Sequence, residues 1–272
     1  MGALLRAELR KTFSTKLWWG LLVPVAVLSL VVNLFGGLFT AAIPVEDGRL
    51  PLLLGSLAYA LGMTSVFAAL HGVVAAAGEF RHRTITSTYL TASGRGPVLL
   101  VKMAASAFVG ALYALVTVLV GVLAGLVGQV GPGFPAVGPL LAVTLIGTAV
   151  AVLWSVLGAA LGTVVSNQVG AIVAALVYMM LGELLISTLL NRSESLSVRR
   201  LTGYLPVNAG DVALYDVPAR ELVGTADSAT FVEFFAGVTA PPPWWGALLV
   251  LAAWTAAVAA TGWVVGARRD VT

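Results

Sequence analysis

Long apolar stretches separated by short polar ones are the dominant pattern of the chain. A helix needs about 20 apolar residues to cross the hydrocarbon core of a membrane. We predict such helices over residues 17–40, 52–77, 98–127, 137–165, 169–190 and 244–267. The apolar runs lack the alternation of barrel strands, so the predicted fold class is an all-α membrane protein with six transmembrane helices. Residues 1–272 then form a single transmembrane domain.

The composition agrees with this prediction. Hydrophobic residues make up 59% of the chain and charged residues 10%, whereas soluble domains carry about 25% charged residues. The mean hydropathy is +1.00. The first apolar run follows several basic residues, as in a signal peptide, but it is longer than the apolar core of about 7 to 15 residues in such peptides. We therefore expect a retained helix.

The basic residues indicate the orientation of the predicted helices. The N-terminus, the segment 78–102 and the C-terminus together carry ten Lys and Arg residues, and the stretches on the opposite side carry five. By the positive-inside rule, the first side is cytoplasmic and both termini lie inside. The pI near 9.4 then reflects topology, and we expect no nucleic-acid partner.

The N-terminal segment, residues 1–16, has the pattern of an amphipathic helix. Leu5, Leu9 and Phe13 recur at every fourth position, which places them on one face. We predict an interfacial helix at the cytoplasmic surface of the bilayer. The alternative is a plain extension of the first span.

The last polar stretch, residues 191–243, is long. It contains four Arg and six acidic residues among short apolar pieces, and loops of this length are usually functional. We predict a large extracytoplasmic loop with short helices that cap the outer face or partly re-enter the membrane; a passive ordered loop is the alternative. The acidic residues are too scattered for a calcium-binding loop.

Motifs for catalysis are absent from the sequence. There is no cysteine, which excludes disulfides and thiolate zinc sites. None of the three lysines follows the glycine that a phosphate-binding loop requires, and His71 and His82 lack the spacing of a zinc-binding helix. We expect the chain itself to be non-catalytic and to bind no cofactor or metal.

Glu183 is the one acidic residue inside a predicted span. An ionisable group at this position is costly and usually faces the bundle interior or a water-filled cavity. We consider Glu183 a candidate for the translocation path. The alternatives are a position near the outer interface or a hydrogen bond to a neighbouring helix.

Small residues recur at helical spacing in the fourth span, at Gly147, Ala151, Ser155, Ala159 and Thr163. Such a face lets two helices approach each other closely in lipid. The partner helix belongs either to the same chain or to a second copy, and we favour the same chain.

The segment "GEFRHRTITSTYLTASGRGPVLLVK", residues 78–102, carries several charges between two long apolar runs. Pro97 suits the first turn of the returning helix. The residues before it can form about two helical turns with Ile85, Tyr89 and Leu90 on or near one face. A short helix with a basic rim can bind a soluble partner; the alternative is a loop whose arginines meet anionic lipid.

This segment resembles the cytoplasmic loop of type-2 ATP-binding cassette (ABC) exporter permeases. The residues that carry the resemblance are Glu79, Arg81, His82, Thr84, Ile85, Leu90, Thr91, Arg95 and Lys102. The sequence departs from the family where Arg83 replaces the usual Gly and Ala92 the usual Pro. The basic N-terminal helix, the six spans and the long last outer segment also look like that family.

The resemblance implies a role for residues 78–97. In the family, a short coupling helix after the second span contacts a separate ATPase subunit, which binds ATP and Mg. Carried over to this sequence, the contact residues are Glu79, Arg81, Thr84, Ile85, Tyr89, Leu90 and Arg95. Family members pair two permease copies with two such ATPase subunits.

The implied function is that of a permease of an ATP-driven exporter in the bacterial cell membrane. The nearly uncharged membrane interior suits a hydrophobic or amphipathic substrate, such as a drug, a lipid or a peptide. Two alternatives stay open: an ATP-independent secondary transporter that uses Glu183, and a membrane immunity or scaffold protein that transports nothing.

Overall fold

A computed structural model describes residues 2–42, 52–81, 94–128, 134–165 and 167–268. Within these ranges every regular element is a helix. Six helical runs are long and apolar enough to cross a membrane, which confirms the predicted multi-pass membrane protein. They are α2 (Leu17–Ala42), α3 (Leu52–Arg81), α5 (Arg95–Gly128), α6 (Val137–Val164), the continuous run from α7 to α8 (Gln168–Asn191) and α11 (Trp244–Arg268).

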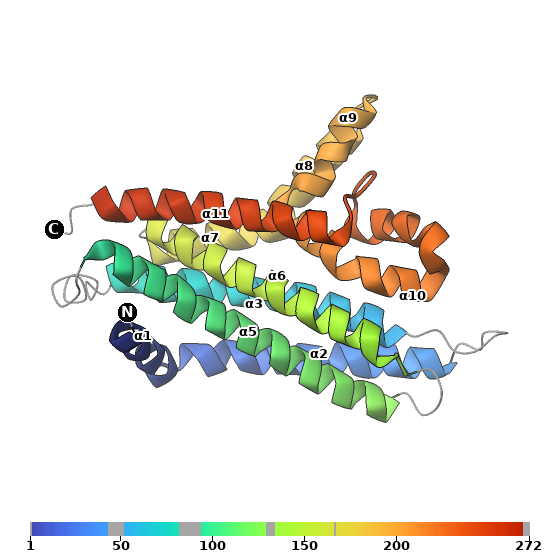
Figure 1. The fold of residues 1–272 in the computed structure, drawn as a ribbon, viewed down its shortest axis with the longest axis horizontal. Helices are drawn as coiled ribbons and strands as arrows, with labels where there is room; N and C mark the ends of the chain where they lie inside the picture. Colours follow the sequence, from blue (N-terminus) through green and yellow to red (C-terminus); the bar gives the residue numbers. More distant parts are fainter. Residues whose placement is uncertain (1, 43–51, 82–93, 129–133, 166, 269–272) are drawn as a thin grey trace.

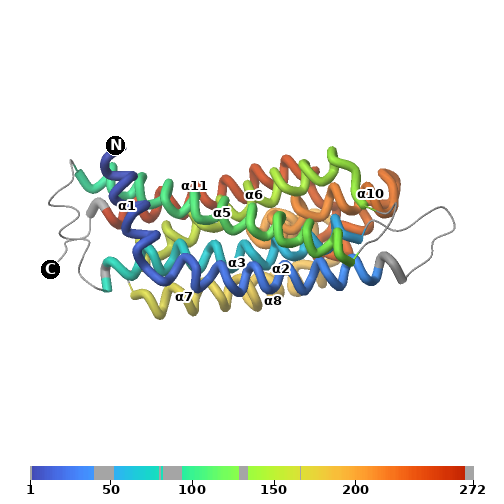
Figure 2. Tube along the Cα trace, turned by 90° about the horizontal axis from the view of Figure 1, so that it is seen from below, coloured from blue at the N-terminus to red at the C-terminus, as the bar shows by residue number. Residues whose placement is uncertain are grey.

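The long helices lie side by side in one bundle (Figures 1 and 2). Helix α11 ends at the same end of the bundle at which α1 begins, and we term it the N/C end. The helix α1 (Gly2–Ser14) is set across this end beside α2 and α5 (Figure 1). Its apolar positions recur as predicted; its location at a membrane surface stays a prediction.

Helix α3 is the centre of the bundle. It packs against α2, α5, α6, α7 and α10, and it is the most enclosed of the six candidate spans. Its closest neighbour is α6, because glycines face each other across the contact. A Cβ atom on Gly158 would collide with the backbone carbonyl of Ala69, and one on Gly72 with that of Ser155. The small residues of the fourth span therefore pack within the chain, as favoured above.

Buried polar side chains also join α2, α3 and α5. Ser29 Oγ donates a hydrogen bond to the carbonyl of Thr117 at 2.6 Å, and the hydroxyls of Thr64 and Thr117 lie 2.7 Å apart. Ser56 Oγ donates to Asn33 Oδ1 at 2.9 Å. These bonds satisfy polar groups that lipid could not, so they hold the three helices in register.

The run from α7 (Gln168–Val177) to α8 (Glu183–Asn191) is interrupted by the π-helical turn η1 (Tyr178–Gly182). A turn of this kind kinks a helix. After it, α8 points away from the bundle together with α9 (Leu196–Arg199), as Figure 1 shows. Leu184, Leu185 and Leu189 are accordingly more than 60% exposed.

The stretch predicted as a loop with short helices is more ordered than expected. After α9 and the 3-10 turn η2 (Arg200–Tyr204), α10 (Pro206–Ala236) extends over 31 residues, with a kink at Gly224, whose φ is 78°. It packs against α3, α6 and α11. The indole of Trp254, in the middle of α11, donates to the carbonyl of Tyr204 at 2.9 Å. Helix α10 therefore begins partway along the bundle (Figure 1).

The contact between α3 and α6 yields a direct test. Gly158→Ala should destabilise the purified protein by about 1–3 kcal/mol, because overpacking forces the two backbones apart. The readout is thermal unfolding in detergent. Gly138→Ala is the matched control in the same helix, since a Cβ atom there would meet nothing within 4 Å. Equal melting temperatures for the two variants would contradict the packing described here.

Candidate functional site

Three of the seven predicted contact residues, Glu79, Arg81 and Arg95, are described, and they lie at the N/C end. Glu79 and Arg81 close α3, and Arg95 opens α5. Thr84, Ile85, Tyr89 and Leu90 lie outside the described residues. The two helices that bracket the predicted coupling segment can thus be described, and the predicted docking face cannot.

Glu79 belongs to a buried ionic cluster, which we define as Glu8, Lys11, Glu79 and Lys102. Lys102 Nζ lies 2.7 Å from Glu8 Oε1 and 2.9 Å from Glu79 Oε1. Lys11 forms an ion pair with the same oxygen of Glu79. Glu79 and Lys102 are each only 3% exposed. The cluster therefore fastens α1 to the ends of α3 and α5 with balanced charge.

Electrostatics make this cluster sensitive to the loss of its two most buried members, Glu79 and Lys102. Taking a charge out of water is costly, and a partner at hydrogen-bonding distance offsets that cost. Burial lowers the pKa of Lys11, the positive charge of Lys102 lowers it further, and Glu8 raises it. Lys11 is also the most exposed member of the cluster, so it is the one whose ion pair is most easily exchanged for water.

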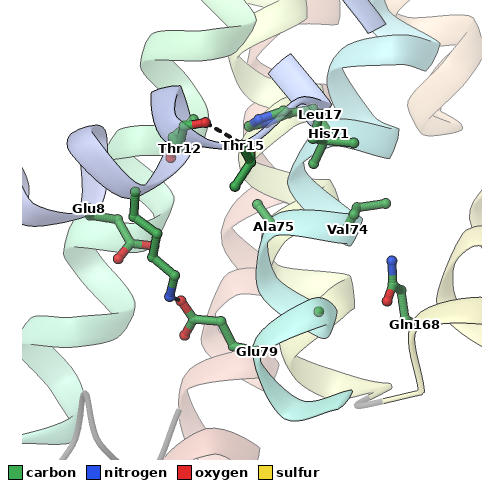
Figure 3. A pocket seen from close by; sticks show the side chains of 11 residues that line it. Glu8, Thr12, Thr15, Leu17, His71, Val74, Ala75, Glu79 and Gln168 are labelled. Carbon is green, nitrogen blue, oxygen red and sulfur yellow. Dashed lines mark hydrogen bonds and ion pairs between the residues drawn. The ribbon is translucent and has the colours of Figure 1, made fainter. Parts of the chain in front are cut away.

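A cavity of about 370 Å³ lies between α1, α3 and the start of α7. Figure 3 shows Glu8 and Glu79 at its rim and Thr12, Val74 and Ala75 along its walls. His71 also lines it; this histidine is 1% exposed, and its Nδ1 atom has no hydrogen-bond partner among the described residues. The cavity thus combines an apolar wall with a charged rim.

Arg81 connects the end of α3 to the beginning of α7. It is exposed and donates to Gln168 Oε1 over 3.5 Å. Gln168 is the first residue of α7, whose N-terminus is capped by the Asn167 side chain accepting from the Gly170 amide at 3.2 Å. The end of α3 therefore touches both α1 and the beginning of α7.

Glu183 occupies a different part of the molecule. Its carboxylate accepts hydrogen bonds from the backbone amides of Val207 at 2.9 Å and of Asn208 at 2.6 Å. These amides belong to the first turn of α10. The N-cap residue of this helix is Leu205, whose side chain has no atom that could accept a hydrogen bond from them. Glu183, 1% exposed, thus caps α10 from a neighbouring helix. This is one of the alternatives stated above; a place on a translocation path stays a prediction.

Sequence reasoning missed two members of the cluster, Glu8 and Lys11, because their partners lie far away along the chain: Lys11 pairs with Glu79, and Glu8 pairs with Lys102, 94 residues away. Lys102 carried a usable signal. A lysine within the first turns of an apolar helix must find an acidic partner, and Glu79 is the nearest acidic residue in the sequence.

No family model matches the chain, and a search of curated proteins gave no match. What stands is a multi-pass helical membrane protein with an ionic cluster at the N/C end and a capped helix farther along the bundle. The likeness to ABC permeases rests on the residues of the 78–102 segment.

The ionic cluster can be tested by removing its central charge. Lys102→Met removes the ammonium group that pairs with both Glu8 and Glu79 and leaves Lys11 as the one basic member of the cluster. This change should lower the free energy of unfolding by about 3–5 kcal/mol. Lys16→Met, which alters an exposed lysine just before α2, should cost nothing measurable. The double variant Glu79→Gln/Lys102→Met should recover part of the loss. A Lys102→Met protein as stable as Lys16→Met would contradict a structural role for the cluster.

The capping role of Glu183 predicts a local effect. Glu183→Ala should speed hydrogen exchange at the amides of Val207 and Asn208, because a lost cap costs about 0.5–2 kcal/mol. Glu183→Gln should lie between this variant and the unchanged protein, since one acceptor oxygen remains. Exchange is followed by mass spectrometry in nanodiscs, with Glu194→Ala, at an exposed position, as control. Unchanged exchange in Glu183→Ala would rule out the cap.

Proposed function

We propose that the chain is the membrane-spanning permease subunit of an ATP-driven ABC exporter. Separate ATPase subunits bind and hydrolyse ATP, and residues 78–97 transmit their motion to the helix bundle. The chain contributes no catalytic residue. Its cargo is a hydrophobic or amphipathic molecule, and it resides in the bacterial cell membrane with the N/C end in the cytoplasm.

The observation that carries this proposal is the ionic cluster beside the predicted docking segment. A docked ATPase subunit would pull on residues between Glu79 and Arg95, where α3 ends and α5 begins. Lys102 joins Glu79 to Glu8 by contacts of 2.9 and 2.7 Å. A displacement of the segment would therefore move α1, α3 and α5 together, because breaking the buried ion pairs is costly.

The course of α8 supports the pairing of two permease copies. This helix and α9 point away from the bundle (Figure 1), with leucines more than 60% exposed. In the family that the sequence resembles, two permeases face each other, and such a projecting element would find a surface on the second copy. Only differential binding of ATP to two states of that assembly can drive a change in accessibility.

The secondary transporter that uses Glu183 is the less favoured candidate. Both carboxylate oxygens of Glu183 already accept backbone hydrogen bonds. A carboxylate that cycles between bound and free ions would have to release those amides at each turnover, which would uncap α10. The observation thus favours a fixed structural role for this residue.

An affinity pull-down from native membranes tests the proposal. The chain is solubilised in several mild detergents and captured, and ATPase activity is measured in the eluate. An ATPase should co-purify with the unchanged chain and be lost with Tyr89→Ala/Leu90→Ala, because apolar contacts on the coupling helix would be removed. The matched control Leu201→Ala/Tyr204→Ala alters two side chains that are about half exposed, outside the predicted segment. It should retain the ATPase.

Absence of a co-purifying ATPase would contradict the proposal. If no ATPase accompanies the unchanged chain in any of the detergents, while the chain is folded by its melting transition, the exporter function is wrong. An ATPase that is lost equally from both double variants would place the docking surface elsewhere.

A further inference from the structure

A second cavity lies deep among the helices, away from the ionic cluster. Its volume is about 160 Å³, and α3, α6, the π turn η1 and α10 form its walls. About 30 Å³ is the share of one water molecule in the liquid, so the space suits a group of several heavy atoms. Most of its lining is apolar or contains sulfur, with Met63, Met179 and Met180 among the lining residues.

Among the described residues that line this cavity, Asp211 is the only acidic one. It lies in the second turn of α10 and reaches α3, where its Oδ1 is 3.5 Å from the position that a Cβ atom on Gly62 would take. Neither a hydrogen bond nor an ion pair from the described residues reaches it. An unpaired carboxylate among apolar helices is costly, and such groups usually mark a functional site.

Trp154 presents a second polar group to the same cavity. The residue is 4% exposed, and its indole nitrogen lies 3.4 Å from the position of a Cβ atom on Gly210, the residue before Asp211. Its N–H group has no hydrogen-bond partner within the part of the chain that the structure describes. An indole donor and a carboxylate acceptor thus both line the cavity, and no described residue forms a hydrogen bond to either.

The other acidic side chains near the cavity already have partners within the protein. Glu183 caps α10 through Val207 and Asn208. Asp216, one turn beyond Asp211, is paired with Arg220 at 3.0 Å. The described residues that line the cavity include no basic side chain. The charge of Asp211 is therefore left for a ligand to balance.

The chemistry of these walls selects a particular headgroup. A carboxylate only accepts, so it favours a cation with N–H donors, and an aromatic ring and thioether sulfurs add attraction for an ammonium group. The indole N–H requires an acceptor oxygen. A protonated primary amine with a hydroxyl group on the neighbouring carbon satisfies both. A purely apolar molecule would leave Asp211 and Trp154 unpaired.

We propose that Asp211 and Trp154 bind the amine headgroup of an amphipathic amine, with Asp211 as the ammonium acceptor and Trp154 as the donor to an adjacent oxygen. The apolar tail leaves past Met180, which is 45% exposed on the outside of the bundle. This inference deepens the proposed function, because it names the class of cargo, but binding itself requires no ATPase subunit.

Three probes of equal chain length separate the two contacts. They are 2-amino-1-octanol, octylamine and 1-octanol, and their binding to the chain in nanodiscs is measured by equilibrium dialysis, with empty nanodiscs subtracted. We expect saturable binding with affinity falling in that order. Octanol should bind at least tenfold more weakly than octylammonium, since it lacks the charge that Asp211 attracts. This comparison needs only the unchanged protein.

Variants then assign the contacts to residues. Asp211→Asn should weaken octylammonium binding at least tenfold, whereas Asp211→Glu, which keeps the charge, should retain most of it. Trp154→Phe should abolish the preference for the amino alcohol over the amine while leaving amine binding in place. Asp227→Asn makes the same chemical change at an exposed position of α10 and should have no effect.

Three results would overturn the inference: no saturable amine binding to the unchanged chain, octanol bound as tightly as octylammonium, or Asp211→Asn binding like the unchanged chain. A preference for the amino alcohol that survives Trp154→Phe would remove Trp154 from the site. Amine binding without a co-purifying ATPase would overturn the exporter function alone. An ATPase without amine binding would overturn only this site.

Discussion

Polar groups inside the bundle are costly unless they find partners, because lipid tails offer none. Glu79 and Lys102 meet this constraint by pairing with each other and with α1. Glu183 meets it by accepting two amides that would otherwise be unsatisfied at the start of α10. In each case a costly group fixes the position of an element that apolar packing alone would leave free to slide.

This constraint explains why α10 returns into the bundle. Its first turn carries amides that no N-cap side chain satisfies, and the carboxylate that satisfies them follows directly after the π turn. The same turn directs α8 away from the other helices (Figure 1). The kink and the cap therefore belong together: the chain leaves the bundle after Glu183, and α10 comes back to it at the same residue.

The six spans could be predicted from the sequence because hydropathy is a local property, and their observed ends fall within a few residues of the predicted ones. Close packing of the small residues of the fourth span within the chain was also predicted from their spacing, although the partner helix, α3, was not. Nor was the position of Asp211. This residue lies in the polar stretch that was predicted as a loop, and contacts between distant residues, among them the cap provided by Glu183, bring it beside Gly62. Long-range contacts of this kind leave no local pattern.

Helix α3 links the two regions that matter for the proposed function. Glu79 lies at one end of it, within the ionic cluster, and Gly62 lies farther along, against Asp211. Between them, Gly72 and Ala69 touch α6 backbone to backbone, which leaves no side chain to absorb a displacement. A push on the segment after Glu79 would therefore reach the deeper cavity as a movement of α3 and α6 as one unit. The walls contributed by η1 and α10 are held by the separate contacts of Glu183, so such a movement changes the space around Asp211 and Trp154.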